Sequence, residues 1–116
     1  MSTPYEVQKC LVMAYSSETC HPSYVSKWSS ERPTVGQCAI TAVYLHEIFG
    51  YDIYDVMVGR SRHFFNKKPD GSIIDLTSEQ FDYEINYESA RKRNPKDIIK
   101  SVKKRYEILK TRMQNL

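Results

Sequence analysis

Three side chains of this sequence, Cys38, His63 and Asp75, are of the types that form a nucleophile, a base and an orienting acid. The segment around Cys38 fits the start of a helix, where the helix dipole and free backbone amides favour a thiolate over a thiol. A histidine can hold that thiolate as an ion pair and later protonate a leaving amine, while a carboxylate fixes the imidazole. The sequence therefore predicts that Cys38 attacks, His63 transfers the proton and Asp75 orients the imidazole.

Four further residues are candidates for the same site. The backbone amide of Cys38, assisted by the Gln37 side chain, is placed to donate hydrogen bonds to a developing oxyanion. Gly36 has no side chain and would let another chain approach the thiol closely. We assign Gly36, Trp28 and Asn66 as candidate substrate-binding residues, although Asn66 is also suited to bracing the strand that carries His63.

The nucleophile depends on a central buried helix. Thr34-Val35-Gly36-Gln37 matches a capping box, which predicts a helix that begins near Cys38. The following residues, 39–45, are apolar on nearly every side, and Gly50 is a natural terminator. Upstream we expect a first helix over 4–16, capped by Thr3 and with Cys10 on its apolar face. We expect a long irregular connection over 17–33 that either covers the cleft or occupies it.

A β-hairpin should bring the base and the acid together. Strand-like segments at 53–58, 62–66 and 73–76 surround a Lys-Pro-Asp-Gly turn. A three-residue loop pairs Lys68 with Ser72, so Phe65 faces Asp75. His63 then lies on the same face as Asp75, as a diagonal neighbour at roughly 7–8 Å.

Two further elements follow the hairpin. Thr77-x-x-Gln80 repeats the capping-box pattern and predicts a short helix or turn over 79–83. Asn94 and Pro95 open a terminal helix. Its apolar stripe consists of Ile98, Ile99, Val102, Tyr106, Leu109 and Met113.

Composition limits the class of protein. The 116 residues, 41% of them hydrophobic and with 14 aromatic residues, suit one globular domain over 1–116. The chain lacks an apolar run of membrane-spanning length and a secretory signal pattern, so we expect a cytoplasmic protein. Three cysteines without a CxxC pattern indicate reduced thiols.

The other interpretations of these residues are weaker. We predict no metal site or cofactor, because Cys10, Cys20, His21, His46 and His63 lack the spacing of structural zinc ligands. From residue 86 onward the net charge is +7, which suggests nucleic-acid binding; a solvated helix face explains this charge better. Homodimerisation through the apolar stripe of the terminal helix stays open.

Motifs along nearly the whole chain resemble the YunG-like family of small bacterial proteins. The shared features are Ser16-x-x-Thr19, Trp28-Ser29 followed by Pro33, GQCAITA at 36–42, Gly50, His63-x-x-Asn66, Gly71, DLTSEQF at 75–81 and RYEILKTRM at 105–113. The GQC and DLTxxQF motifs are the most specific. The resemblance implies a fold and a candidate Cys/His/Asp site without naming a reaction.

These observations predict an α+β fold in which helices pack on a small antiparallel sheet. The order of thiol, imidazole and carboxylate is that of papain-like and transglutaminase-like cores. The predicted function is thiol-dependent acyl transfer on a peptide or amide substrate. The same residues also fit a non-catalytic binding module in which Cys38 is a small buried hydrophobe and His63 a half-exposed strand residue.

Overall fold

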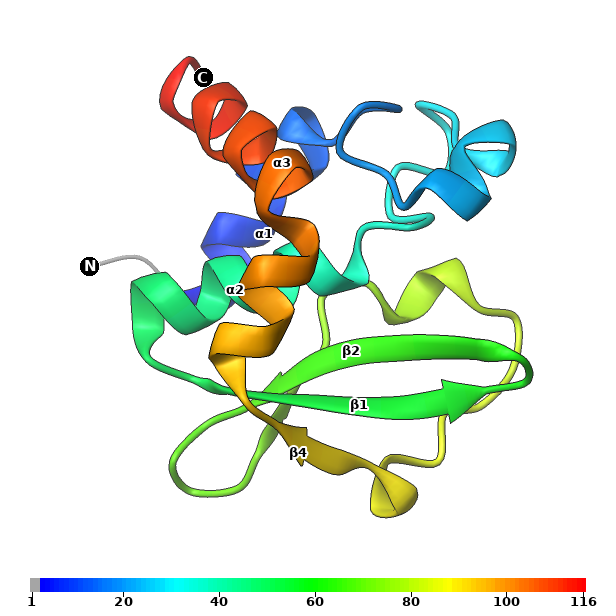
Figure 1. Cartoon of the computed structure of the whole chain (residues 1–116), viewed down its shortest axis with the longest axis vertical. Helices are drawn as coiled ribbons and strands as arrows, with labels where there is room; N and C mark the ends of the chain where they lie inside the picture. The colour runs from blue at the N-terminus through cyan, green and yellow to red at the C-terminus, as the bar shows by residue number, and fades with distance from the viewer. Residues whose placement is uncertain (1–2) are drawn as a thin grey trace.

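Helices and one four-stranded antiparallel sheet make up the fold, which a computed structural model describes for residues 3–116 (Figure 1). The predicted α+β class is confirmed. The helices are α1 (Pro4–Ala14), α2 (Cys38–Phe49) and α3 (Pro95–Gln114). The strands are β1 (Asp52–Val58), β2 (Ser61–Lys67), β3 (Ile73–Ile74) and β4 (Arg91–Arg93), in the order β3-β2-β1-β4. Short 3-10 segments are η1 (Pro22–Lys27), η2 (Ser78–Gln80) and η3 (Tyr87–Ser89).

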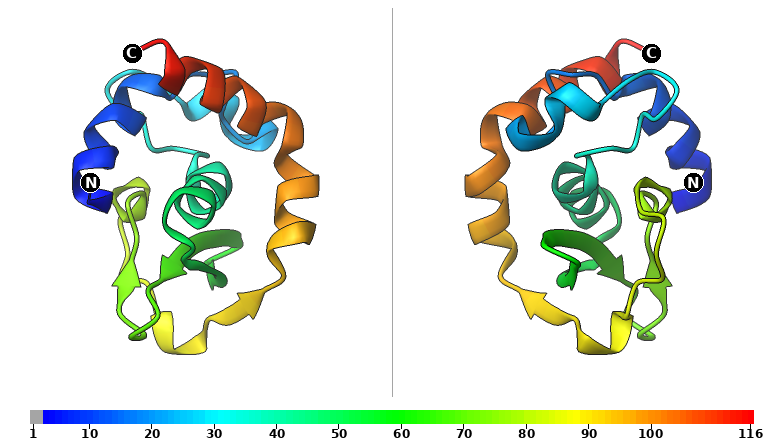
Figure 2. Two further views of the ribbon diagram at one scale, coloured as in Figure 1. Left: turned by 90° about the vertical axis from the view of Figure 1, so that its left-hand side faces the viewer. Right: turned by 90° about the vertical axis from the view of Figure 1, so that its right-hand side faces the viewer.

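Helix α2 runs through the middle of the molecule, with α1, α3 and the sheet arranged around it (Figure 2). Its apolar residues are buried, as their continuous run predicts. Gly50 ends the helix with a left-handed φ of 76°, a conformation that glycine adopts without steric cost. The predicted capping box is wrong, because Gln37 itself is the N-cap and its side chain makes no capping bond.

Helices α1 and α3 cover α2 from two sides (Figure 2). The caps are as predicted: Thr3 accepts from the amide of Glu6, and Asn94 accepts from that of Lys96. Helix α1 ends at Ala14, two residues earlier than predicted. Cys10 is exposed, so its predicted place in the core is wrong.

The apolar stripe of α3 is packed against the rest of the chain. Its buried members are Ile98, Val102, Tyr106 and Leu109. They join the cluster that surrounds α2. Within residues 3–116, no helix combines the length and the apolar character that crossing a bilayer requires.

The sheet has the predicted hairpin register. In the pairing of β2 with β3, Asn66 lies opposite Ile74, and the amide of Lys68 donates to the carbonyl of Ser72. Strand β4 was not predicted, since Arg-Lys-Arg has none of the apolar alternation that indicates a strand. It forms because its side chains bind acids of β1: Arg91 and Arg93 both pair with the buried carboxylate of Asp55.

Both sides of the sheet are covered. The side that faces the helices contributes Ile53, Phe64 and Ile74 to the main core. The opposite side carries a second apolar cluster centred on Val56 and Phe65. The segment 81–90 packs over this second cluster, which places it next to His63 of β2.

Candidate functional site

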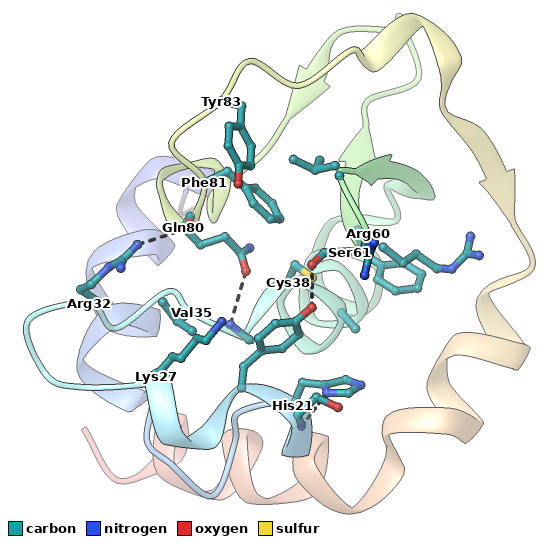
Figure 3. A pocket seen from close by; sticks show the side chains of 18 of the residues that line it. His21, Lys27, Arg32, Val35, Cys38, Arg60, Ser61, Gln80, Phe81 and Tyr83 are labelled. Atoms are coloured by element: carbon teal, nitrogen blue, oxygen red, sulfur yellow. Dashed lines mark hydrogen bonds between the residues drawn. The ribbon is translucent and has the colours of Figure 1, made fainter.

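Cys38 is the first residue of α2 and is half-buried at the edge of a cleft (Figure 3). The first amides of a helix have no acceptor within the helix, so the N–H groups beside this thiol are available to another group. The dipole of α2 also places partial positive charge there. Cys38 thus lies at the start of a helix, where the sequence predicted it.

The His63 imidazole is held by the carboxylate of Asp75 and lies near the thiol of Cys38. Its Nε2 donates to Oδ2 of Asp75 over 2.6 Å, and its Nδ1 lies 3.4 Å from Nε2 of Gln80. The ring is fully buried, and the edge of Phe81 packs against it with ring centroids 4.9 Å apart. Burial lowers the pKa of His63, but hydrogen bonds to Asp75 and then to Cys38 outweigh it and raise that pKa to about 9.

Asp75 is fixed from three directions. Besides His63, the hydroxyl of Tyr87 donates to its Oδ2 over 2.8 Å, and the backbone amide of Thr77 donates to its Oδ1 over 3.2 Å. Only 5% of the Asp75 side chain is exposed. The carboxylate is therefore held in one orientation, and residues separated by 37 positions in the chain form one cluster of thiol, imidazole and carboxylate.

The cleft beside Cys38 has a volume of about 540 Å³. Segment η1 forms one wall, the turn between β1 and β2 another, and residues 80–83 a third (Figure 3). The hydroxyls of Tyr24 and Ser61 lie 2.6 Å apart and join η1 to β2. The irregular segment 17–33 thus contributes a wall of the cleft rather than a cover over the thiol.

Gln37 does not have the geometry predicted for an oxyanion donor. Its side chain is completely buried, where its Oε1 accepts from Thr19 over 2.8 Å and its Nε2 donates to the carbonyl of Ser16 over 3.1 Å. Gln80 is the glutamine in the cleft: its Nε2 lies 3.4 Å from Nδ1 of His63, and its Oε1 accepts from the amide of Gly36.

The three predicted substrate-binding residues have structural partners. Trp28 donates from its indole to the carbonyl of Pro33 and is not among the residues that line the cleft. Asn66 is buried, and its Nδ2 bridges the carbonyls of Ala42 and Asp52 at 3.0 and 3.3 Å. Both side chains stabilise the fold, so their assignment to the substrate is not supported.

Gly36 lines the cleft and has a left-handed φ of 71°. The chain that approaches it is the protein's own: a Cβ built on Gly36 would lie 2.4 Å from Sγ of Cys20. Cys20 is buried there and donates to the carbonyl of Val35. Gly36 therefore allows close packing of the segment before Cys38 and also lines the cleft.

Three residues of the site escaped the sequence interpretation. Gln80 was assigned to a capping box, but its side chain binds the carbonyl of Thr77 rather than a helix end. Tyr87 lies in an irregular segment that carries no pattern. Arg105 does carry a signal, because it lies three residues after Val102 and seven after Ile98, on the flank of the apolar stripe where charge is unusual.

The comparisons with known proteins agree with the resemblance in the motifs. The family described as "YunG protein" matches residues 3–116. The chain belongs to the YunG family. A curated relative named "Uncharacterized protein YunG", from Bacillus subtilis (strain 168), is 43% identical over 63 residues. That alignment covers 54% of this chain and 54% of the relative, so the chain spans about half the length of the YunG protein it matches. No solved structure matches the chain.

No metal centre is evident near the site. Within residues 3–116, no three His, Cys, Asp or Glu side chains are grouped as metal ligands. His46, one of the histidines considered for such a site, instead has its Nδ1 2.8 Å from the carbonyl of Tyr51.

Proposed function

We propose that this protein is a thiol-dependent acyl-transfer enzyme in which Cys38 attacks the carbonyl carbon of an amide substrate. The observation that carries the proposal is the His63 imidazole, which is fixed by a buried carboxylate and faces a half-exposed thiol at the start of a helix. A merely structural histidine has no need of a thiol on one side and a fixed carboxylate on the other.

In the first half of the reaction, the Cys38 sulfur forms a bond to the carbonyl carbon and the carbonyl oxygen becomes an oxyanion. The backbone amide of Cys38, in the first turn of α2, is the donor proposed for that oxyanion. The C–N bond then breaks, and the proton carried by His63 passes to the departing nitrogen. The products are a thioester on Cys38 and a free amine.

In the second half, water or an acceptor amine attacks the thioester. His63 takes the proton of the attacking group, the C–S bond breaks, and the Cys38 thiolate returns as the acid or the new amide departs. Water as the acceptor gives hydrolysis, and an amine gives transfer. Asp75 keeps the imidazole in the orientation that both halves require.

The order of the three groups supports this proposal. A cysteine at the start of a helix, followed by a histidine and an aspartate on neighbouring strands, is the layout of papain-like and transglutaminase-like enzymes. Such a layout is recognised by the geometry and the roles of its groups, and the same arrangement occurs on unrelated folds.

The test compares the reactivity of the thiols within one chain. Iodoacetamide is added at about pH 6, and the modified cysteines are quantified by peptide mass spectrometry. We expect Cys38 to react at least about tenfold faster than the exposed Cys10, because the proposed His63 partner takes up the proton of this thiol when the sulfur attacks. Buried Cys20 serves as a second internal reference.

Two variants attribute that reactivity to the site. His63→Ala should slow the labelling of Cys38 at about pH 6 without changing that of Cys10. Circular dichroism and the protection of Cys20 report whether the variant is folded. Equal, slow labelling of Cys38 and Cys10 in the folded wild type would refute the proposal and favour a cleft that only binds. As a direct assay, p-nitrophenyl acetate should leave an acyl group on Cys38 and none in Cys38→Ser.

A further inference from the structure

The cleft beside Cys38 is lined by basic side chains from four separate parts of the chain. Lys27 lies on η1, Arg32 follows it, Arg60 and Arg62 lie at the turn of the β1–β2 hairpin, and Arg105 comes from α3. Within the part of the chain that the structure describes, no aspartate or glutamate lines this cleft. The thiol therefore faces a space of concentrated positive charge (Figure 3).

Four of these five charges have no carboxylate partner within the described residues. Arg62 pairs with Asp55 over 3.1 Å. Across residues 3–116, the other four basic groups of the cleft have no carboxylate within ion-pair distance. Elsewhere the same chain does pair its arginines, since Arg91 and Arg93 both bind Asp55. An unpaired cluster of this kind is suited to a ligand that brings the negative charge.

Arg105 is the most informative member of this set. It is partly buried, and its NH1 donates to the carbonyls of Thr19 and Gly36 at 3.0 and 3.5 Å. Backbone carbonyls fix the direction of a guanidinium without neutralising it. Burial lowers the pKa of Arg105, and the nearby sulfurs of Cys38 and Cys20 oppose that lowering. An oriented cation thus lies beside the reacting atom, which is the arrangement that holds a carboxylate or a phosphate.

We propose that the substrate of this site carries an anionic group, a carboxylate or a phosphate, which Arg105 and the basic rim of the cleft bind while Cys38 attacks the acyl carbon. This inference rests on the proposed function and adds the charge of its substrate. The geometry has the cation and the nucleophile facing one space, so the anionic group belongs to the same portion of the substrate as the reacting carbonyl.

The test uses two alkylating reagents that differ in charge. Iodoacetate and iodoacetamide attach to the same sulfur by the same displacement of iodide, so the ratio of their rates cancels the intrinsic reactivity of the thiol. We expect this ratio to be about tenfold higher at Cys38 than at the exposed Cys10, because nearby cations concentrate the anionic reagent. Raising NaCl from about 0.05 to about 0.5 M should reduce the difference, since the Debye length falls from roughly 14 Å to roughly 4 Å.

Matched variants distinguish a local effect from net charge. The double variant Lys27→Gln/Arg60→Gln removes two exposed charges from the rim of the cleft, and Lys100→Gln/Lys103→Gln removes two exposed charges from α3. The ratio at Cys38 should fall several-fold in the first variant and stay unchanged in the second. Arg105→Gln should lower the ratio further, with Cys20 protection reporting that the fold is retained.

The outcomes separate the two proposals. If Cys38 reacts fast with iodoacetamide and its ratio equals that of Cys10, the anionic substrate is refuted and the proposed function stands. If Cys38 reacts slowly with both reagents, the proposed function fails and this inference fails with it. Glutarate and inorganic phosphate, compared at equal ionic strength, identify the group by which of them slows the labelling of Cys38. Absence of protection by both refutes the inference.

Discussion

Replacing Asp75 with asparagine tests the central contact of the site. Asparagine keeps the size of the side chain and an oxygen acceptor for Thr77, but it removes the charge that faces His63. With that charge removed, the lowering of the His63 pKa by burial is opposed only by Cys38. We expect the His63 pKa to fall from about 9 in the wild type to below the ordinary 6.5. NMR titration of labelled histidine rings measures this change directly.

The same change predicts how stability depends on pH. The folded-state pKa of His63 is raised, so its contribution is complete below about 6.5 and is lost as the pH rises through about 9. A rise of the His63 pKa from 6.5 to about 9 corresponds to roughly 3 kcal/mol in the free energy of unfolding. Asp75→Asn should therefore cost on the order of 2–3 kcal/mol more at about pH 6 than at about pH 9.5, measured by urea unfolding.

Asp70→Asn is the matched control for this experiment. Asp70 lies in the exposed turn of the same hairpin, where it binds Ser72, and its lowered pKa keeps it ionised throughout this range. Its replacement should have the same effect at both pH values. If Asp75→Asn also destabilises the protein equally at both, then His63 does not carry its proton in the folded state and the argument for an imidazolium beside Cys38 is wrong.

Three further predictions concern residues around the site. Asp55→Asn should lower the free energy of unfolding by about 3 kcal/mol at neutral pH, because three arginines lose their buried partner. Burial raises the pKa of Asp55, but hydrogen bonds to Arg91, Arg93 and Arg62 outweigh it and lower that pKa. The contribution of Asp55 to wild-type stability is therefore present above about pH 4 and is lost as the pH falls further, which acid unfolding of both proteins measures. Gly36→Ala should lower the free energy of unfolding by more than about 2 kcal/mol, and by less in a Cys20→Ala background, because the new Cβ meets Sγ of Cys20. Gly59→Ala, with open space around it, should lower it by only about 1 kcal/mol. Equal losses of stability in thermal melts of the two variants would contradict this reasoning. Asn66→Ala should lower the free energy of unfolding by about 1–3 kcal/mol while leaving the iodoacetamide rate of Cys38 unchanged, and a loss of reactivity without a loss of stability would return Asn66 to the substrate.

The backbone positions of Cys38, His63 and Asp75 were predictable from local patterns. Turn chemistry at Pro69 and Gly71 fixes the hairpin register, and alternation along a strand then puts His63 and Asp75 on one face. The apolar run after Cys38 and the glycine at its end define the central helix. Each of these features depends on a few neighbouring residues, so one sequence contains enough information to predict these backbone positions.

The residues that surround Cys38, His63 and Asp75 could not be predicted in the same way. Whether Gln37 or Gln80 faces the thiol depends on the fold of segment 17–33. Thr19 of that segment donates to Oε1 of Gln37 and holds this side chain in the interior. Strand β4 is stabilised by ion pairs to Asp55 and not by an apolar pattern. Tyr87 reaches Asp75 from a segment without periodicity. These contacts are polar and join residues far apart in the sequence, so the spacing of residues along the chain does not predict them.

The hydrogen bond between His63 and Asp75 depends on the turn between β2 and β3, which contacts neither side chain. Strand β3 pairs with β2 at only two positions, and the bend that joins them is exposed. Lengthening that bend by one residue would shift the alternation and turn the Asp75 carboxylate to the far surface of the sheet. Insertions at this solvent-facing tip, which most hairpins tolerate, would here disconnect the acid from the base.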